Sequence, residues 1–332
     1  MVLVDAFGRV ATDLRVSVTD RCNLRCTYCM PPEGLDWIPG DDLLSADELV
    51  RLIGLAVDEG VREVRFTGGE PLVRPDLETI VAGAAALRPI PEMSLTTNGI
   101  GLAERATALR DAGLTRINVS LDTLVADRFT RLTRRNRLPA VLDGISAAQE
   151  AGLSPVKINT VLMRGVNDDE VVDLVNWSLR SGLKLRFIEQ MPLDAQHAWS
   201  RTEMIRADEI IERLAAAYTI EPAGEPRGSD PAERWTVTAR DGSLHGEVGI
   251  IGSVTRPFCS ACDRVRLTSD GQLRNCLFAR DESDLRSPLR NGASDDELIA
   301  IMRSCLAAKK AGHGIDDPTF VPPPRPMSAI GG

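Results

Sequence analysis

The segment LRVSVTDRCNLRCTYCM, residues 14–30, decides the fold of this chain. A short apolar strand pattern, residues 14–18, leads directly into three closely spaced cysteines, Cys22, Cys26 and Cys29. Clustered cysteines that do not belong to a disulfide framework indicate metal binding or reactive chemistry. The segment therefore predicts a strand that carries a thiol-based site at its carboxyl end.

Five more segments have strand character, and amphipathic helical stretches separate them. These strand segments are residues 61–66, 93–97, 115–121, 156–162 and 184–190. A capping-box pattern, Ser45 with Glu48, starts the first helix, and further helices are expected from about residues 75, 102, 139 and 168. Alternating strands and helices are typical of βα units on a parallel sheet. We predict a partial (βα)6 barrel of the TIM type, with a doubly wound open sheet as the alternative.

Polar residues gather in and just after these strands. Because active sites of such barrels form at the carboxyl ends of the strands, we expect these residues to meet at one mouth. They are residues 67–71 (TGGEP), 96–99 (TTNG), Ser120 and Asp122, Lys157 and Asn159, and 189–191 (EQM).

The character of the chain changes after residue 222. Residues 221–232 (EPAGEPRGSDPA) are rich in Gly and Pro and predict a linker. Short strand-like pieces and a second cysteine group, Cys259, Cys262 and Cys276, follow it. We therefore predict two domains, a barrel over residues 1–222 and a smaller C-terminal lobe over residues 223–332. The seventh cysteine, Cys305, shares a helix face with Leu298, Ile301 and Met302, which indicates a core residue.

Each cysteine group offers only three thiol ligands. Structural zinc normally takes four ligands, and His197, His245 and His313 all lie far from both groups in the sequence. Zinc remains an alternative, because a histidine that is distant in the sequence can complete a zinc site. An iron–sulfur cluster on three cysteines keeps one iron free for a small molecule. The repeated shortage and the spacing of the first group favour iron–sulfur there, whereas the second group alone leaves both metals open.

Composition narrows the class of protein further. The 332 residues include 39 Lys and Arg against 48 Asp and Glu, a net charge of −9, and aromatic residues make up only 4%. Binding of nucleic acid needs a basic face or aromatic residues that stack on the bases, so we expect no nucleic-acid partner. Asp5 lies where a signal peptide would have its apolar core, and no apolar run is long enough to span a membrane. We expect no membrane contact, no secretory leader and a cytoplasmic location.

The first triad, with Tyr28 before its last cysteine, resembles the cluster motif of radical S-adenosylmethionine (SAM) enzymes. The turn Gly68-Gly69-Glu70-Pro71 resembles the segment of that superfamily that holds the methionine amino group of SAM. The second triad, within residues 258–278 (FCSACDRVRLTSDGQLRNCLF), and the end RPMSAIGG, residues 325–332, resemble the GTP 3′,8-cyclase family of molybdenum cofactor biosynthesis. The resemblance runs from about residue 14 to residue 332.

This resemblance implies a lyase-class reaction that starts molybdenum cofactor biosynthesis. One [4Fe–4S] cluster on Cys22, Cys26 and Cys29 would cleave SAM to a 5′-deoxyadenosyl radical, which takes the ribose 3′ hydrogen of GTP. The carbon radical then attacks C8 to give (8S)-3′,8-cyclo-7,8-dihydroguanosine 5′-triphosphate. A second [4Fe–4S] cluster on Cys259, Cys262 and Cys276 would hold the guanine.

The resemblance also assigns binding residues. The implied SAM contacts are Tyr28, Gly69, Ser120 and Met191, and the implied GTP contacts are Arg15, Arg65, Thr96, Lys157, Arg264, Val265 and Arg266. Arg264 and Arg266 are implied to be catalytic as well, and Arg186 is a further candidate for GTP. Guanidinium and ammonium groups suit the oxygens of a triphosphate.

Three further expectations follow from the same resemblance. Relatives often carry Lys where this chain has Glu63, so we expect Glu63 to leave the phosphate site and point outward. The Gly331-Gly332 end is expected to thread toward the active site. The implied partners are GTP, SAM, an external electron donor and, by pathway, cyclic pyranopterin monophosphate synthase; a homodimer is compatible with these. Two rival hypotheses stay open: another radical SAM enzyme with an auxiliary cluster, such as a peptide-modifying one, and a non-catalytic zinc-binding module.

Overall fold

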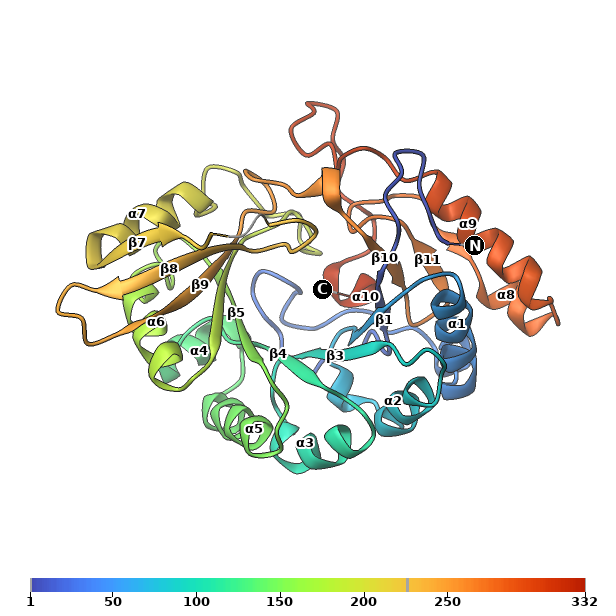
Figure 1. The fold of residues 1–332 in the computed structure, drawn as a ribbon, viewed down its shortest axis with the longest axis horizontal. Helices are drawn as coiled ribbons and strands as arrows, with labels where there is room; N and C mark the ends of the chain where they lie inside the picture. Colours follow the sequence, from blue (N-terminus) through green and yellow to red (C-terminus); the bar gives the residue numbers. More distant parts are fainter. Residues whose placement is uncertain (1, 225–226, 332) are drawn as a thin grey trace.

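The computed structural model describes residues 2–224 and 227–331, and their strands form one continuous, strongly curved sheet (Figure 1). The spatial order is β12-β11-β10-β1-β2-β3-β4-β5-β6-β9-β8-β7. The strands are β1 (Asp13–Ser17), β2 (Glu63–Thr67), β3 (Glu92–Thr97), β4 (Arg116–Ser120), β5 (Val156–Leu162), β6 (Lys184–Glu189), β7 (Tyr218–Pro222), β8 (Glu233–Ala239), β9 (His245–Ile251), β10 (Arg264–Leu267), β11 (Gln272–Arg274) and β12 (Ser283–Asp284). From β1 to β6 all neighbours are parallel, so the predicted six-stranded partial barrel is confirmed.

Helices cover the outer face of this sheet (Figure 1). They are α1 (Ala46–Asp58), α2 (Leu77–Ala85), α3 (Leu102–Asp111), α4 (Ala126–Thr133), α5 (Leu138–Glu150), α6 (Val171–Arg180), α7 (Ala207–Ala217), α8 (Arg286–Arg290) and α9 (Asp295–Ala307). The short helix α10 (Met327–Ile330) lies on the inner side instead, and short 3-10 turns occur at Gly40–Asp42, Pro71–Val73 and Cys259–Ala261. The predicted capping box is present at α1, where Ser45 and Glu48 bond each other's backbone N–H groups.

The C-terminal part of the chain extends the barrel at both edges. Strand β9 pairs in parallel with β6, and β10 pairs in parallel with β1. Strands β7 and β8 pair antiparallel with each other, with Pro222 opposite Trp235. Residues 221–232, predicted as a linker between lobes, therefore connect neighbouring strands of the same sheet. The domain boundary at residue 222 stays a prediction, and it falls between these two paired strands.

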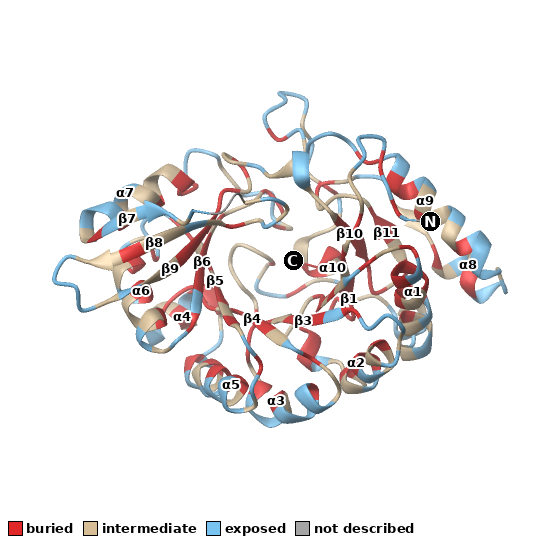
Figure 2. Cartoon of the chain, in the orientation of Figure 1, coloured by how far each residue is buried: buried red, intermediate tan, exposed pale blue. Residues whose placement is uncertain are grey.

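Side chains alternate between the core and the interior of the barrel. Leu14 and Val16 are almost fully buried in the layer between strands and helices, whereas Arg15 and Ser17 face the interior of the barrel. Figure 2 shows buried residues along the strands of the sheet and exposed residues on the outer sides of the helices. On α9, Cys305 is buried in the same core, and its thiol lies 3.6 Å from the carbonyl oxygen of Leu273. Cys305 is thus a core residue, as predicted.

The C-terminal end of the chain returns into the barrel, where α10 lies beside β1 (Figure 1). Gly331 is so close to two strands that a Cβ there would lie 2.4 Å from Ser17 Oγ and 2.6 Å from Thr67 Cγ2. Its φ of +76° is also a backbone conformation that favours glycine. The expected approach of the tail is confirmed up to Gly331, and Gly332 lies outside the described residues.

In the part of the chain that the structure describes, every helix is too short or too polar to cross a lipid bilayer.

Candidate active site

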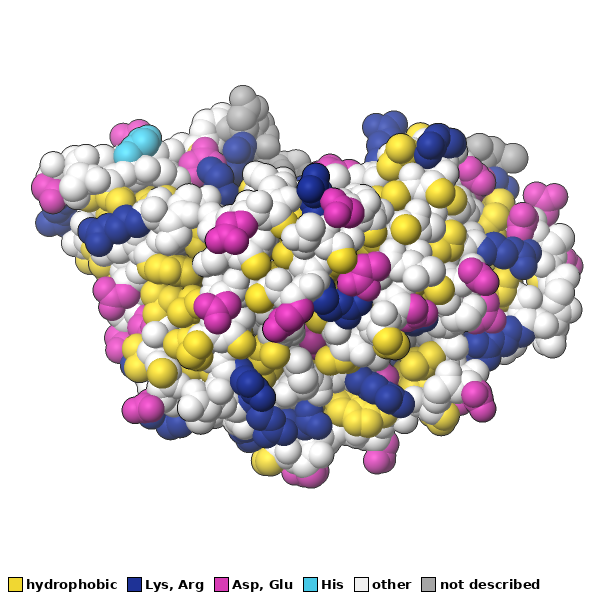
Figure 3. Space-filling model, turned by 90° about the horizontal axis from the view of Figure 1, so that it is seen from below, with side chains coloured by type: hydrophobic (Ala, Val, Ile, Leu, Met, Phe, Trp, Pro, Cys, Tyr) yellow, Lys and Arg dark blue, Asp and Glu magenta, His cyan; other side chains and the backbone are white. Residues whose placement is uncertain are grey.

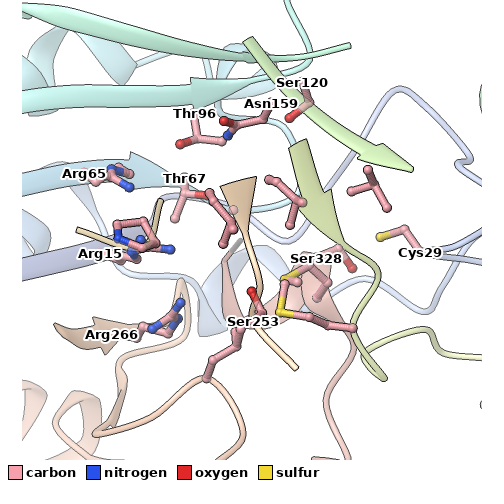
Figure 4. Close-up of a pocket in the computed structure, with 18 of the residues that line it drawn as sticks. Arg15, Cys29, Arg65, Thr67, Thr96, Ser120, Asn159, Ser253, Arg266 and Ser328 are labelled. Atoms are coloured by element: carbon pink, nitrogen blue, oxygen red, sulfur yellow. The ribbon is translucent and has the colours of Figure 1, made fainter. Parts of the chain in front are cut away.

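A cavity of about 320 Å³ occupies the interior of the barrel, and both cysteine triads line it. Most of the residues expected at the site share this one cavity. They are Cys22, Cys26, Cys29, Cys259, Cys262 and Cys276, together with Arg15, Tyr28, Arg65, Gly69, Thr96, Ser120, Arg186, Met191, Arg264 and Arg266. In Figure 4, Arg15, Arg65 and Arg266 lie on one side of the cavity, and Cys29 lies on the other. The cavity therefore has a guanidinium-rich side and a thiol side.

The loop that carries the first triad is held by the turn after β2. The backbone N–H groups of Gly69 and Glu70 donate to the carbonyl oxygens of Thr19 and Arg21, at 2.8 and 2.7 Å. A Cβ on Gly69 would lie 2.4 Å from the carbonyl oxygen of Arg21. Only glycine allows this close approach. The Gly-Gly turn thus fixes the position of the cysteine loop.

Buried acidic groups lie beside the first triad. The hydroxyl of Tyr28 donates to Asp122 at 2.7 Å, and burial raises the pKa of Asp122 to about 6. Glu70 is almost fully buried; it accepts hydrogen bonds from Thr97 and from the backbone of Asn98, and burial raises its pKa to about 7. Burial also raises the pKa of Cys29 to about 12. This side of the cavity therefore suits a cationic ligand.

Opposite the first triad, four arginines come from three neighbouring strands. Register places Arg15 of β1 beside Arg65 of β2 and Arg266 of β10, and Arg264 beside Asp13. Asp13 Oδ2 lies 3.2 Å from Arg264 Nε and 3.9 Å from both Arg15 and Arg65. Burial opposes ionisation of Asp13, but the guanidinium groups hold its pKa below the usual range. One carboxylate thus faces four cations.

Several polar atoms of this cluster lack hydrogen-bond partners within the described residues. They include Arg15 Nε, Arg264 Nε and Nη1, and Asp13 Oδ1. Burial and the other arginines lower the pKa of Arg15, and burial lowers that of Arg266 to about 10. Buried positive charge with unused donors is expensive without a counterion. The cluster therefore has the properties of an anion-binding site.

Two of the expected GTP contacts do not line this cavity. Val265 is buried between Arg264 and Arg266, so its side chain points to the opposite face of β10. Lys157 lines a neighbouring cavity of about 460 Å³, with Lys184, Arg227 and Asp230. Arg186 lines both cavities and donates to Asn159 and Asn118 at 3.0 and 2.8 Å. Burial and Arg186 lower the pKa of Lys157 to about 8.

The side chain of Glu63 does not point outward, which contradicts the expectation from the sequence. It lies two residues before Arg65 on β2, on the same face, and its carboxylate accepts from Arg116 at 2.8 Å. Arg116 also pairs with Glu92 at 2.9 Å. At this position the chain therefore has an acidic group that neutralises a neighbouring arginine.

Sequence reasoning missed some residues of the site. Asp13 was not singled out, although its position two residues before Arg15 on a strand places both on one face. Phe258, whose ring centroid lies 4.6 Å from the Arg264 guanidinium, and Ser328 of α10 also line the cavity. Phe258 directly precedes Cys259, and Ser328 lies in the C-terminal segment 325–332, but neither residue type by itself indicates a binding role.

The cysteines fit two clusters that each keep an open position. All six are free thiols that line the cavity wall. Within residues 2–224 and 227–331, no three His, Cys, Asp or Glu side chains converge closely enough to hold a single metal ion. Three thiols on a wall, with a cavity in front of them, match a cluster whose remaining iron faces a ligand.

Two family models together match most of this chain. Residues 16–178 match the family model of the Radical SAM superfamily, and residues 183–315 match that of Molybdenum Cofactor Synthesis C. The crystal structure of Streptococcus suis SuiB bound to S-adenosylmethionine shares the fold with a TM-score of 0.58 at 15% identity, covering 89% of this chain and 69% of that one. Fold and site define a radical SAM enzyme.

Curated relatives narrow the class. A GTP 3′,8-cyclase of Streptomyces coelicolor is 62% identical over 100% of this chain and 96% of its own length. Those of a Mycobacterium species and of Corynebacterium glutamicum are 60% and 56% identical, covering 99% and 100% of this chain and 93% and 89% of their own lengths. The chain belongs to the GTP 3′,8-cyclase family.

Proposed function

We propose that this chain binds SAM and GTP in the barrel cavity and converts GTP to (8S)-3′,8-cyclo-7,8-dihydroguanosine 5′-triphosphate, the first step of molybdenum cofactor biosynthesis. The observation that carries the proposal is the composition of one cavity, in which two cysteine triads and a cluster of four arginines face the same space. The curated names of the relatives support the same reaction.

The thiol side of the cavity would receive SAM. Its sulfonium and ammonium groups are cations, and the buried carboxyl groups of Asp122 and Glu70 lie on this side. Tyr28, Gly69, Ser120 and Met191 are proposed contacts, and all four line the cavity. When bound, the cluster on Cys22, Cys26 and Cys29 would supply the electron that cleaves the sulfonium bond.

The guanidinium side would receive the triphosphate of GTP. Arg15, Arg65 and Arg266 offer donors to its oxygens, and Thr96 lines the same cavity. Arg264 is already held over Phe258 and against Asp13, so it is placed to orient its neighbours as well as to bind. Lys157 and Val265 remain proposed contacts, Lys157 through the neighbouring cavity and Val265 through its backbone.

The second triad would hold a second [4Fe–4S] cluster whose open iron faces the guanine. Cys259, Cys262 and Cys276 lie on the same cavity as the arginine cluster, which supports a role in substrate binding. The barrel walls and α10 surround this space and would keep water from the reacting atoms. We propose the cytoplasm as location, an external electron donor, and delivery of the product to cyclic pyranopterin monophosphate synthase.

The decisive experiment is an anaerobic incubation of reconstituted protein with dithionite, SAM and GTP. We expect 5′-deoxyadenosine and a cyclised guanosine triphosphate in equal amounts. 5′-Deoxyadenosine without the cyclised nucleotide would support another radical SAM activity, such as peptide modification. About one zinc per triad and no sulfide would instead support the zinc-binding module.

A further inference from the structure

A buried lysine lies directly behind the second cysteine triad. Lys309 is only 5% exposed, and its ammonium donates to the carbonyl oxygens of Cys262 and Arg264, at 3.0 and 2.8 Å. Its third contact is Cys262 Sγ at 3.5 Å. All three N–H donors of the ammonium are therefore directed at the short segment that joins the triad to β10.

The charge of Lys309 has no carboxylate partner among the residues that the structure describes. Removing an ammonium from water is unfavourable unless an anion compensates its charge. The group with anionic character in contact with it is the sulfur of Cys262, which carries negative charge as a thiolate ligand. The thiolates of a bound cluster would therefore compensate the buried charge of Lys309.

The backbone of Lys309 is hydrogen-bonded to the end of α9. Lys309 lies two residues after the helix ends at Ala307, and its N–H donates to the carbonyl oxygen of Leu306 at 2.9 Å. The same helix anchors the other part of the triad, because Asn275, next to Cys276, donates to the carbonyl oxygen of Cys305 at 2.8 Å. Helix α9 therefore connects the Cys262 and Cys276 segments.

Arg9 provides a contrast on the other side of the triad. Its guanidinium donates to the carbonyl oxygen of Cys259 at 2.5 Å, but its charge is balanced by Asp5, also at 2.5 Å. Both cations hold the backbone of a cysteine, and Lys309 is the one that also contacts a ligand sulfur and lacks a carboxylate.

We infer that Lys309 is a positioning residue for the second cluster: it fixes Cys262 and the start of β10, and its positive charge stabilises the reduced form of the cluster. This inference rests on the second cluster of the proposed function. Because an added electron makes the cluster more negative, a nearby cation raises its reduction potential. The same ammonium ties Cys262 to the strand that carries Arg264 and Arg266.

The test uses the full chain with Cys22, Cys26 and Cys29 changed to Ala, so that iron and spectra report on the second triad alone. In this background Lys309→Gln keeps a hydrogen-bond donor but removes the charge. We expect it to retain most of the iron and sulfide and to shift the midpoint potential to a more negative value, measured by electron paramagnetic resonance during titration with dithionite. Lys309→Arg should restore the parent potential, and Lys309→Met should also lose iron.

Two matched controls separate charge from structure. Lys310→Gln removes an exposed neighbouring charge, and Arg9→Gln removes a charge that Asp5 already balances, so both should shift the potential less than Lys309→Gln. An unchanged potential in Lys309→Gln, or equal shifts in both controls, would overturn the role of Lys309. Absence of iron and sulfide in the background protein itself would overturn the second cluster of the proposed function, and this role with it.

Discussion

The two cysteine triads share one cavity but have opposite electrostatic surroundings. Beside the first triad lie the buried carboxyl groups of Asp122 and Glu70. Beside the second lie Lys309 and the arginines of β10. Burial raises the pKa of Cys29 to about 12, whereas at Cys262 burial is outweighed by Lys309, Arg264 and Arg266 together, and the pKa is lowered.

This difference shows how one barrel can hold a cation and an anion together. The net charge of the chain is −9, and acidic and basic side chains are interspersed on the face shown in Figure 3. The arginines inside the barrel are therefore a local feature of β10, β1 and β2. A sulfonium beside carboxyl groups and a triphosphate beside guanidinium groups would each find a counterion.

The largest expected effect separates the two triads. Cys26→Ala should reduce SAM cleavage to background, because two thiolates cannot hold the first cluster. Cys262→Ala should abolish GTP cyclisation and spare a larger part of uncoupled SAM cleavage. Both are measured as 5′-deoxyadenosine and cyclised nucleotide under anaerobic conditions. Survival of 5′-deoxyadenosine formation in Cys26→Ala, or equal loss of both activities in Cys262→Ala, would contradict the division of roles.

The second largest effect is expected at the arginine cluster. Arg15→Met removes a buried cation whose Nε has no hydrogen-bond partner in the described residues. A charge-assisted hydrogen bond contributes about 1.5–3 kcal/mol, so KM for GTP should rise about 10- to 100-fold while SAM cleavage changes little. Arg110→Met, at a half-exposed arginine on α3, is the control. An equal rise in KM for SAM would show that Arg15 does not distinguish the two sides.

Much of the barrel could be predicted, because its strands carry a local signal. Segment 14–18 corresponds to β1, and 156–162 matches β5. The extension by β9 and β10 could not be predicted, because each pairs with a strand far away in the sequence. Local periodicity carries no information on such register.

The site shows the same limit. The cysteines and Arg15 are recognisable from spacing and strand position, whereas Lys309 depends on how α9 packs. Glu63 was expected to point outward, and the prediction was wrong because strand alternation places it on the face of Arg65, where it pairs with Arg116 of β4. Residues fixed by long-range packing give no sequence pattern of their own.

A smaller effect is expected where the tail lies between the two sides. In Gly331→Ala the new Cβ would lie 2.4 Å from Ser17 Oγ, and the φ of +76° would be strained. The tail should leave its place, lowering cyclised product about tenfold for an interaction of ~1.4 kcal/mol. Gly292→Ala has a similar φ of +81° with nothing within 4 Å, so it reports strain alone. Equal activities of the two variants would exclude a role for this contact.

The smallest effect should appear as a pH dependence of GTP affinity. Burial and Arg186 lower the pKa of Lys157 to about 8, so this ammonium is mainly charged at about pH 7 and loses its proton as the pH rises. A bound triphosphate favours the charged form, and affinity must therefore fall through this range, by about three- to tenfold for a contact of ~1 kcal/mol. The measurements should stay below about pH 8.5. Burial also lowers the pKa of Arg186 to about 9, so this second cation would lose its charge at higher pH. Binding of GTP is measured by equilibrium dialysis in the parent and in Lys157→Met. A parent curve as flat as that of Lys157→Met would show that Lys157 does not contact the triphosphate.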